Sequence, residues 1–178
     1  MDAAQRVFAR KGYRGTSITD IIKESGLSTG AIYGYFDGKD AIFRAVVERV
    51  LTARTQSISP VLGAGPRSPG ELVRDMMRDM RGEPIMLIAP QIWAEAVVEP
   101  KVNELLTQVF ATLSGTLARE LVSWATAHPD RVAGDAEEWA ARVAPVLGSL
   151  MPGFILQRLT ITDFDDDAYF DGLVAALG

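Results

Sequence analysis

Residues suited to catalysis are scarce in this chain of 178 residues. Cysteine is absent and His128 is the single histidine, so a thiolate or histidine zinc site and a Ser/His/Asp triad lack donors. The acidic run at 163–167 lacks the glycine and distal glutamate of a calcium loop, and we expect it to be a solvated, capping cluster. Gly63-Ala64-Gly65 has no third glycine and no preceding strand, so it is not a dinucleotide site. We therefore expect no enzyme activity, no metal and no cofactor, and a solvated helix end at His128.

Two short helices joined by a tight turn are predicted between Thr16 and Phe36. The residues expected to limit them are Thr16 or Ser17 at the start of the first, Gly26 at its end and Ser28 at the start of the second. We expect Leu27 to be an apolar plug between the two helices. A pair of helices that crosses through a glycine-containing turn is the helix-turn-helix unit, whose second helix fits the major groove of DNA.

The second of these helices has small residues on its expected outer face, namely Thr29, Gly30, Ala31 and Gly34. Its larger residues are expected to turn inward against the first helix: Ile32, Tyr33 and Phe36 toward Ile18, Ile21 and Ile22. A glycine inside a helix costs about 1 kcal/mol relative to alanine, so two of them favour a function over mere packing. A plain helical hairpin remains the alternative, and Tyr33 could be a core ring or contact DNA.

The elements that must position this unit are helical, because apolar residues recur at helical spacing and no segment alternates like a half-buried strand. We predict an all-α fold whose boundary is the proline- and glycine-rich segment 57–70. The longer helices are predicted at Glu71–Arg81, Pro84–Val98, Pro100–Ala127, Ala136–Leu159 and Asp166–Leu177. Kinks or breaks are expected at Pro90, Pro145 and Pro152.

Charge is distributed unevenly along the chain, whose net charge is -5. Residues 1–54 hold nine Lys/Arg against six acids, and the remaining residues hold nine against seventeen. Such asymmetry suggests a basic module that meets a polyanion. The longest apolar stretch, 143–156, is interrupted by prolines and glycines and is shorter than the ~20 residues of a spanning helix. With no targeting segment, we expect a cytoplasmic protein.

Residues 3–46 resemble the DNA-binding domain of the TetR family of transcriptional regulators. The matching residues are Ala3-Ala4, Val7-Phe8, Gly12-Tyr13, Thr16-Ser17, Asp20-Ile21, Ser25-Gly26-Leu27-Ser28, Ala31-Ile32-Tyr33, Tyr35-Phe36 and Lys39-Asp40-Ala41-Ile42-Phe43. A weaker resemblance, to the regulatory domain of one branch of the family, lies in 91–96 and 99–101. Ile22 departs from the usual small residue, and the chain begins inside the expected first helix, without the basic arm that many members have.

The resemblance implies an N-terminal three-helix DNA-binding domain, 1–46, and a helical effector-binding and dimerisation domain, 47–178. The residues implied to bind DNA are Ser17, Tyr35 and Lys39 at phosphates and Thr29, Gly30, Ala31 and Gly34 at base edges, with Tyr33 as a further candidate. Neither Arg nor Asn lies on the reading face. We therefore expect DNA shape, or Arg14 and Lys23, to supply part of the specificity.

The second domain is expected to form a homodimer and to bind an effector. The predicted dimer interface, for which an intrachain core is the alternative, consists of Trp139, Val143, Leu147, Leu150, Phe154, Phe170, Leu173 and Val174. The predicted pocket for an apolar ligand, for which ordinary core is the alternative, consists of Met77, Met80, Trp93, Phe110, Leu113 and Trp124. Polar groups that could orient the ligand are Gln91, Glu95, Asn103, Gln108 and Thr112.

Taken together, the resemblance implies a ligand-responsive regulator, a repressor, that binds a palindromic operator as a homodimer and is released by a small molecule. Two alternatives from other classes remain open. One is a helical small-molecule-binding protein, and the other is a small helical enzyme, both without a DNA function.

Overall fold

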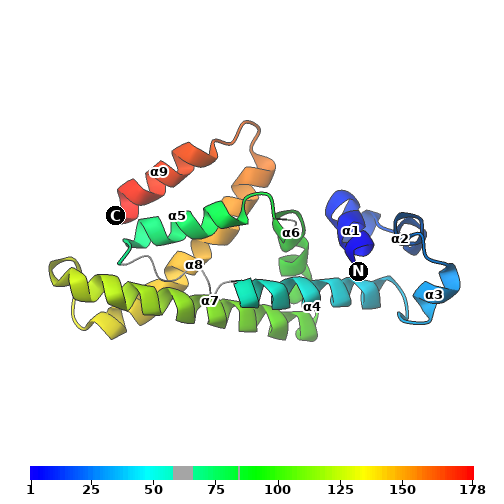
Figure 1. The fold of residues 1–178 in the computed structure, drawn as a ribbon, viewed down its shortest axis with the longest axis horizontal. Helices are drawn as coiled ribbons and strands as arrows, with labels where there is room; N and C mark the ends of the chain where they lie inside the picture. Colours follow the sequence, from blue (N-terminus) through cyan, green and yellow to red (C-terminus); the bar gives the residue numbers. More distant parts are fainter. Residues whose placement is uncertain (58–65, 84) are drawn as a thin grey trace. The chain divides into compact units, whose positions relative to one another are not determined.

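The computed structural model describes residues 1–57, 66–83 and 85–178 (Figure 1). These residues form helices joined by turns and contain no strand, which confirms the all-α prediction. The fold has two compact units. The first consists of Met1–Ala53 and Gly82–Thr107, and the second of Arg54–Arg81 and Gln108–Gly178. Pro84 and most of the predicted boundary segment, 58–65, lie outside the described residues.

The helices of the first unit are α1 (Asp2–Gly15), α2 (Ile18–Ser25), α3 (Thr29–Tyr33), most of α4 (Lys39–Ser57), α6 (Ile85–Ala96) and the start of α7 (Pro100–Ala127). The second unit contains α5 (Pro69–Met80), the rest of α7, the short 3-10 helix η2 (Pro129–Arg131), α8 (Ala136–Thr160) and α9 (Asp166–Leu177). The five longer helices predicted from periodicity all occur, with ends within about two residues of those expected. Of the kinks or breaks predicted at the internal prolines, the breaks do not occur, because α6 and α8 continue through these residues.

The core of the first unit forms where α1 packs against α2 and α6. The rings of Phe8 and Phe43 meet edge to face with centroids 5.0 Å apart. Ile21 and Ile32 bring α2 and α3 onto this core and are 2% and 6% exposed. The predicted plug, Leu27, is 54% exposed, so that prediction is wrong. The buried side chains on either side of the turn are the two isoleucines of α2 and α3.

A kink at Gly12 shapes the end of α1. Gly12 has φ 74° and ψ 165°, a conformation that residues with a side chain rarely adopt. The hydroxyl of buried Thr16 donates to the Gly12 carbonyl at 2.7 Å, which satisfies a group that the kink removes from the helix. The chain therefore turns at Gly12 and brings Tyr13 to α4, where its ring lies 4.8 Å from that of Phe43.

The second unit is organised around α5, which packs on α8 and α9 (Figure 1). At Gly70 the backbones of α5 and α9 touch, since a Cβ atom there would lie 2.8 Å from the Leu173 carbonyl oxygen and 2.9 Å from the Val174 Cα. At the start of α9, Asp165 accepts the backbone N–H groups of Asp167 and Ala168. The acidic run therefore caps a helix, as predicted.

Helix α8 is the one helix in the described part of the chain that is long and apolar enough to cross a membrane by those two criteria. A single helix of this kind is weak evidence, because core helices of other proteins meet the same criteria. In α8 the buried residues include Leu147 and Phe154, which are 3% and 1% exposed within this chain. They contribute to the core of the second unit.

Candidate nucleic-acid interface

Local hydrogen bonds set the start and end of α2. The Ser17 hydroxyl accepts the backbone N–H of Asp20 at 3.1 Å, and the Asp20 carboxylate accepts the Ser17 N–H at 3.0 Å, which completes a capping box. At the other end Gly26 has φ 68° and donates its N–H to the Ile22 carbonyl. Both caps agree with the sequence prediction, with Ser17 rather than Thr16 at the N-terminus.

Helix α3 is short and is held by one buried side chain. The Ser28 hydroxyl accepts the Ala31 N–H at 3.1 Å, which confirms the predicted cap. Ile32 is buried, whereas Thr29 and Gly30 are exposed and Ala31 is half-buried. Most of the helix therefore presents small side chains to solvent.

Gly30 stands in open space. A Cβ atom built on it would meet no heavy atom within 4 Å, beyond the backbone of its own helix. Its φ is not positive, so the backbone at Gly30 has a conformation that residues with a side chain also adopt. Packing within the chain therefore does not require glycine at this position, and alanine would favour the helix by up to about 1 kcal/mol.

Two tyrosines extend the exposed surface beyond α3. Tyr33, at the end of the helix, is 53% exposed, and Tyr35 is 85% exposed. Of the two alternatives for Tyr33, a core ring or a DNA contact, this exposure favours the second, while Ile32 is buried and Phe36 is half-buried. Gly34, the C-cap, is exposed as well.

The two other predicted phosphate ligands already have partners within the chain. The Ser17 hydroxyl donates to the Asp20 carboxylate at 2.8 Å. The Lys39 ammonium, at the first residue of α4, donates to the Tyr13 carbonyl oxygen at 3.0 Å. Lysine has three N–H donors, so Lys39 keeps two for another acceptor, whereas the single hydroxyl proton of Ser17 is in use.

Ion pairs neutralise part of the basic N-terminal segment. Glu24 on α2 pairs with both Arg6 and Arg10 of α1, at 2.9 and 3.0 Å, and Asp20 pairs with Lys11 at 2.6 Å. These bonds hold the pKa values of both carboxyls below the usual range, through Lys11 and then Ser17 for Asp20 and through the two arginines for Glu24. The pairs join α1 to α2.

Other basic side chains of the first unit stay available. Arg14, Lys23 and Arg44 are exposed, and no carboxylate within the described residues forms an ion pair with them or with Lys39. Arg14 and Lys23 are the two residues that the sequence suggested as additional DNA contacts. Positive charge that is not already paired can bind phosphate without first losing an internal partner.

The predicted effector-site residues are divided between the units. Trp93 is half-buried in the first unit, whereas the other five lie in the second. Met77, Met80 and Leu113 are buried, but Phe110 is 39% exposed. The Trp124 ring stacks on the rings of Trp139 and His128, with centroid distances of 5.8 Å and 4.8 Å. His128 thus lies at a helix end, as expected, but it is half-buried and packs on a tryptophan.

Three of the polar residues proposed to orient a ligand make local contacts instead. The Gln91 amide donates to the Phe8 carbonyl at 3.2 Å, within the first unit. The Asn103 amide donates to the Ala96 carbonyl at 3.1 Å, at the end of α6. The Thr112 hydroxyl donates to the Gln108 carbonyl one turn before it. Each of these bonds gives the side chain a structural role.

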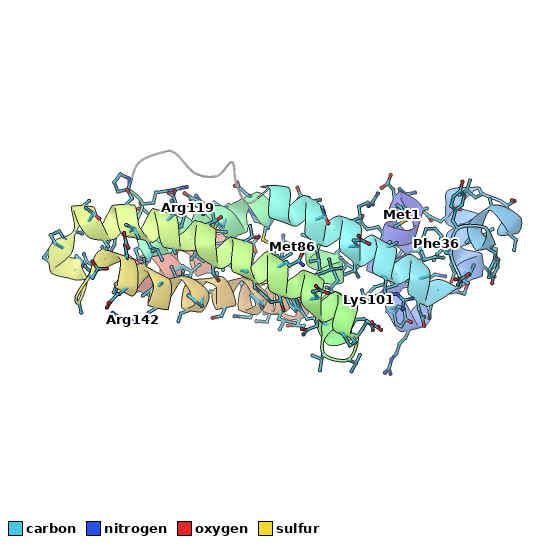
Figure 2. All side chains as sticks on the ribbon, turned by 90° about the horizontal axis from the view of Figure 1, so that it is seen from below. Met1, Phe36, Met86, Lys101, Arg119 and Arg142 are labelled. Carbon is cyan, nitrogen blue, oxygen red and sulfur yellow. The ribbon has the colours of Figure 1, made fainter. Side chains whose placement is uncertain are left out.

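Four of the predicted dimer-interface residues are buried inside this chain. Leu147, Phe154, Phe170 and Leu173 are at most 9% exposed within this chain, which favours the alternative of an intrachain core for these four residues. Their side chains contribute to the intrachain core, where the Phe154 and Phe170 rings lie 5.4 Å apart. The residues Trp139, Val143, Leu150 and Val174 are half-buried. Solvent instead reaches the side of α8 that carries Arg142 and Val146, the latter 61% exposed (Figure 2).

Two short capped helices joined by a turn that contains glycine, with the second helix exposed, form a helix-turn-helix unit. Residues 1–46 match the family described as "Bacterial regulatory proteins, tetR family". These residues therefore carry a TetR-type DNA-binding domain, as the sequence resemblance indicated.

Individual relatives show how far the similarity extends. YfiR, an HTH-type transcriptional regulator of Bacillus subtilis, is 42% identical over 48 residues, which are 27% of this chain and 23% of YfiR. LmrA, an HTH-type transcriptional regulator of the same organism, is 25% identical over 173 residues, which are 90% of this chain and 84% of LmrA. The higher identity thus belongs to a short match, which covers less than a quarter of the relative, and the identity is lower where the match is long.

Among solved structures, the transcriptional regulator FadR from Bacillus subtilis in complex with stearoyl-CoA has a similar fold. Its TM-score is 0.69 at 14% identity, and the alignment covers 98% of this chain and 93% of FadR. At this identity the similarity concerns the fold alone. It extends through both units, well beyond the residues of the helix-turn-helix unit.

Proposed function

We propose that this chain is a ligand-responsive transcriptional regulator, a repressor, which binds a palindromic operator as a homodimer and releases it when a small molecule binds. The proposal rests on the exposed helix-turn-helix unit, on the family match of residues 1–46 and on the fold similarity. The two parts of the function are assigned to residues 1–46, for DNA, and 47–178, for effector and dimer.

The observation that carries the DNA-binding proposal is the open space around Gly30. No atom of the chain requires a glycine there, and a glycine weakens the helix. A binding partner could explain the glycine: without a side chain at position 30, the α3 backbone can approach the base edges and the sugar-phosphate backbone of DNA closely. In this arrangement Thr29 and the Ala31 methyl contact bases, and Tyr33 and Gly34 border the groove.

Phosphate contacts are proposed for the donors around α3. Tyr35 and Lys39 supply a hydroxyl and an ammonium, and the unpaired cations Arg14 and Lys23 extend this surface. Ser17 acts through its place at the helix N-terminus, because its hydroxyl already donates to Asp20. Such contacts fix the register of the protein on the duplex but do not read sequence.

The dimer is proposed to form through the exposed faces of α8 and α9. Large apolar residues on α8 remain in solvent in the single chain: Val146, Leu156 and Leu159 are 61%, 46% and 38% exposed. Half-buried Leu150 lies on the same helix, and Val174 lies on α9. Two copies of α8 and α9 would form a four-helix interface that spaces two reading helices about 34–36 Å apart, as successive major grooves demand.

An apolar effector is proposed for the second domain. Met77, Met80 and Leu113 give this region adaptable, apolar side chains. FadR, which has a similar fold, was solved with stearoyl-CoA, a ligand with a long apolar chain. Release would follow if the ligand stabilises an arrangement in which the two reading helices no longer fit successive grooves. A DNA-bound regulator of this kind acts in the cytoplasm.

The proposal is tested by selecting bound duplexes from a random-sequence library with the wild-type chain. We expect recovered duplexes to share a palindrome and to bind with an affinity that falls steeply as salt rises. Recovery of no common sequence, together with equal binding to unselected duplexes, would contradict the regulator proposal. It would favour a helical ligand-binding protein or enzyme instead.

A further inference from the structure

Lys39 is held at two points by one residue of another helix. Its Nζ donates to the Tyr13 carbonyl oxygen at 3.0 Å and lies 4.5 Å from the centroid of the Tyr13 ring. The contact crosses from the end of α1 to the start of α4, within the first unit. An ammonium over a tyrosine ring is attracted by the negative face of the ring. The end of a long, flexible side chain therefore has a defined position in the absence of DNA.

Tyr13 is itself fixed in place by α4 and by the kink of α1. Its hydroxyl donates to the carboxylate of Asp40, the residue next to Lys39. Its ring packs against Phe43 with centroids 4.8 Å apart and against Phe8 at 6.2 Å. Burial, and then the bond to Asp40, raise the pKa of Tyr13 to about 12, so the hydroxyl keeps its proton at neutral pH.

We propose that Tyr13 is a positioning residue for Lys39, which it presents with two free N–H donors to a DNA phosphate at the N-terminus of α4. This inference rests on the proposed DNA-binding function and adds a residue that does not contact DNA. Ordering a lysine side chain on binding normally costs conformational entropy. Here that ordering has already taken place in the free protein, so the phosphate contact forms with a smaller loss.

A double-mutant cycle tests the proposal with the duplex selected by the wild-type chain. Tyr13→Leu removes the ring and the hydroxyl, and Lys39→Ala removes the ammonium. We expect Tyr13→Leu to weaken binding about two- to tenfold. In a chain that already carries Lys39→Ala, the same change should alter affinity by less than about twofold, because the group that Tyr13 positions is gone.

The salt dependence separates positioning from phosphate contact. Lys39→Ala should lower the slope of log affinity against log salt by about 1, since one phosphate contact is lost. Tyr13→Leu should leave this slope unchanged, because the loosened lysine still reaches the phosphate once DNA is bound. A purely structural effect of Tyr13→Leu would persist in the Lys39→Ala background and would overturn the proposal.

A second variant covers the case in which Tyr13→Leu does not fold. Tyr13→Phe keeps the ring and the carbonyl and loses only the bond to Asp40, so it should weaken binding less, and only when Lys39 is present. Thermal unfolding of each variant checks that the chain is folded at the assay temperature. Equal losses with and without Lys39 would overturn the positioning role. Failure of wild type itself to bind any duplex selectively would instead contradict the proposed function.

Discussion

Replacing Gly30 with alanine should change folding stability and DNA affinity in opposite directions. A methyl group at this position meets no atom of the chain and restricts the unfolded backbone, so the free energy of unfolding should rise. The gain should be about 0.5–1 kcal/mol, toward the lower value because Gly30 lies in the first turn of α3. Thermal or urea unfolding measures it directly.

The same methyl group should obstruct the DNA. A methyl forced into a close-packed contact typically costs about 1–3 kcal/mol, which corresponds to a loss in affinity of about 5- to 150-fold. Fluorescence anisotropy with the selected duplex, at one fixed salt concentration, measures this loss. Gly115→Ala is the matched control, because Gly115 is a helical glycine of α7 in equally open space. It should stabilise the chain and leave DNA affinity unchanged.

The reasoning fails if Gly30→Ala binds the selected duplex as tightly as wild type. The α3 backbone would then not approach the bases closely, and DNA binding would not explain the glycine at this position. A loss of stability would be equally contrary, since it would mean that an atom near Gly30 leaves no room for a methyl group.

Three further changes probe other parts of the chain. Gly70→Ala should destabilise the second unit by about 1–3 kcal/mol or more in urea unfolding, because its methyl would meet the backbone of α9, whereas wild-type stability would disprove the close crossing. Val146→Asp should yield monomers in sedimentation experiments, because it places a charge in the proposed interface. The control Val98→Asp, at a position 75% exposed in the first unit, should not. A dimeric Val146→Asp chain would exclude the proposed interface. Lys11→Gln should lower the melting temperature at neutral pH, because Lys11 lowers the pKa of Asp20 in the folded state. The difference in melting temperature from wild type should shrink as pH falls below about 4 and vanish in stronger acid, where Asp20 is protonated. A difference that does not depend on pH would contradict the ion pair.

The helix limits of the first unit were predictable because they depend on short-range chemistry. Ser17, Gly26 and Ser28 act on backbone groups within four residues, so their roles follow from type and spacing. Leu27 was misplaced, and Tyr33 was left between two alternatives, for the opposite reason. An apolar residue near a turn has no local signal that tells whether a neighbour such as Ile21 or Ile32 already occupies the buried position.

The dimer residues show a related limit of periodicity. Helix α8 is apolar on more than one face, and the pattern alone does not tell which face meets α5 and α7 of the same chain. The structure places Leu147 and Phe154 inside and leaves Val146 and Leu156 in solvent. The contacts of Lys39 with Tyr13 were likewise missed, because residues 26 positions apart leave no mark in local patterns.

The bond between Gln91 and Phe8 has a consequence for protein engineering. The acceptor is a main-chain carbonyl, so any amino acid at position 8 that keeps the helix would offer the same oxygen to α6. A first helix transplanted from another regulator of this fold could therefore keep its attachment to α6, even with little sequence in common. A hybrid chain that receives the N-terminal segment of another protein, α3 included, should therefore be designed so that this carbonyl keeps its place against α6.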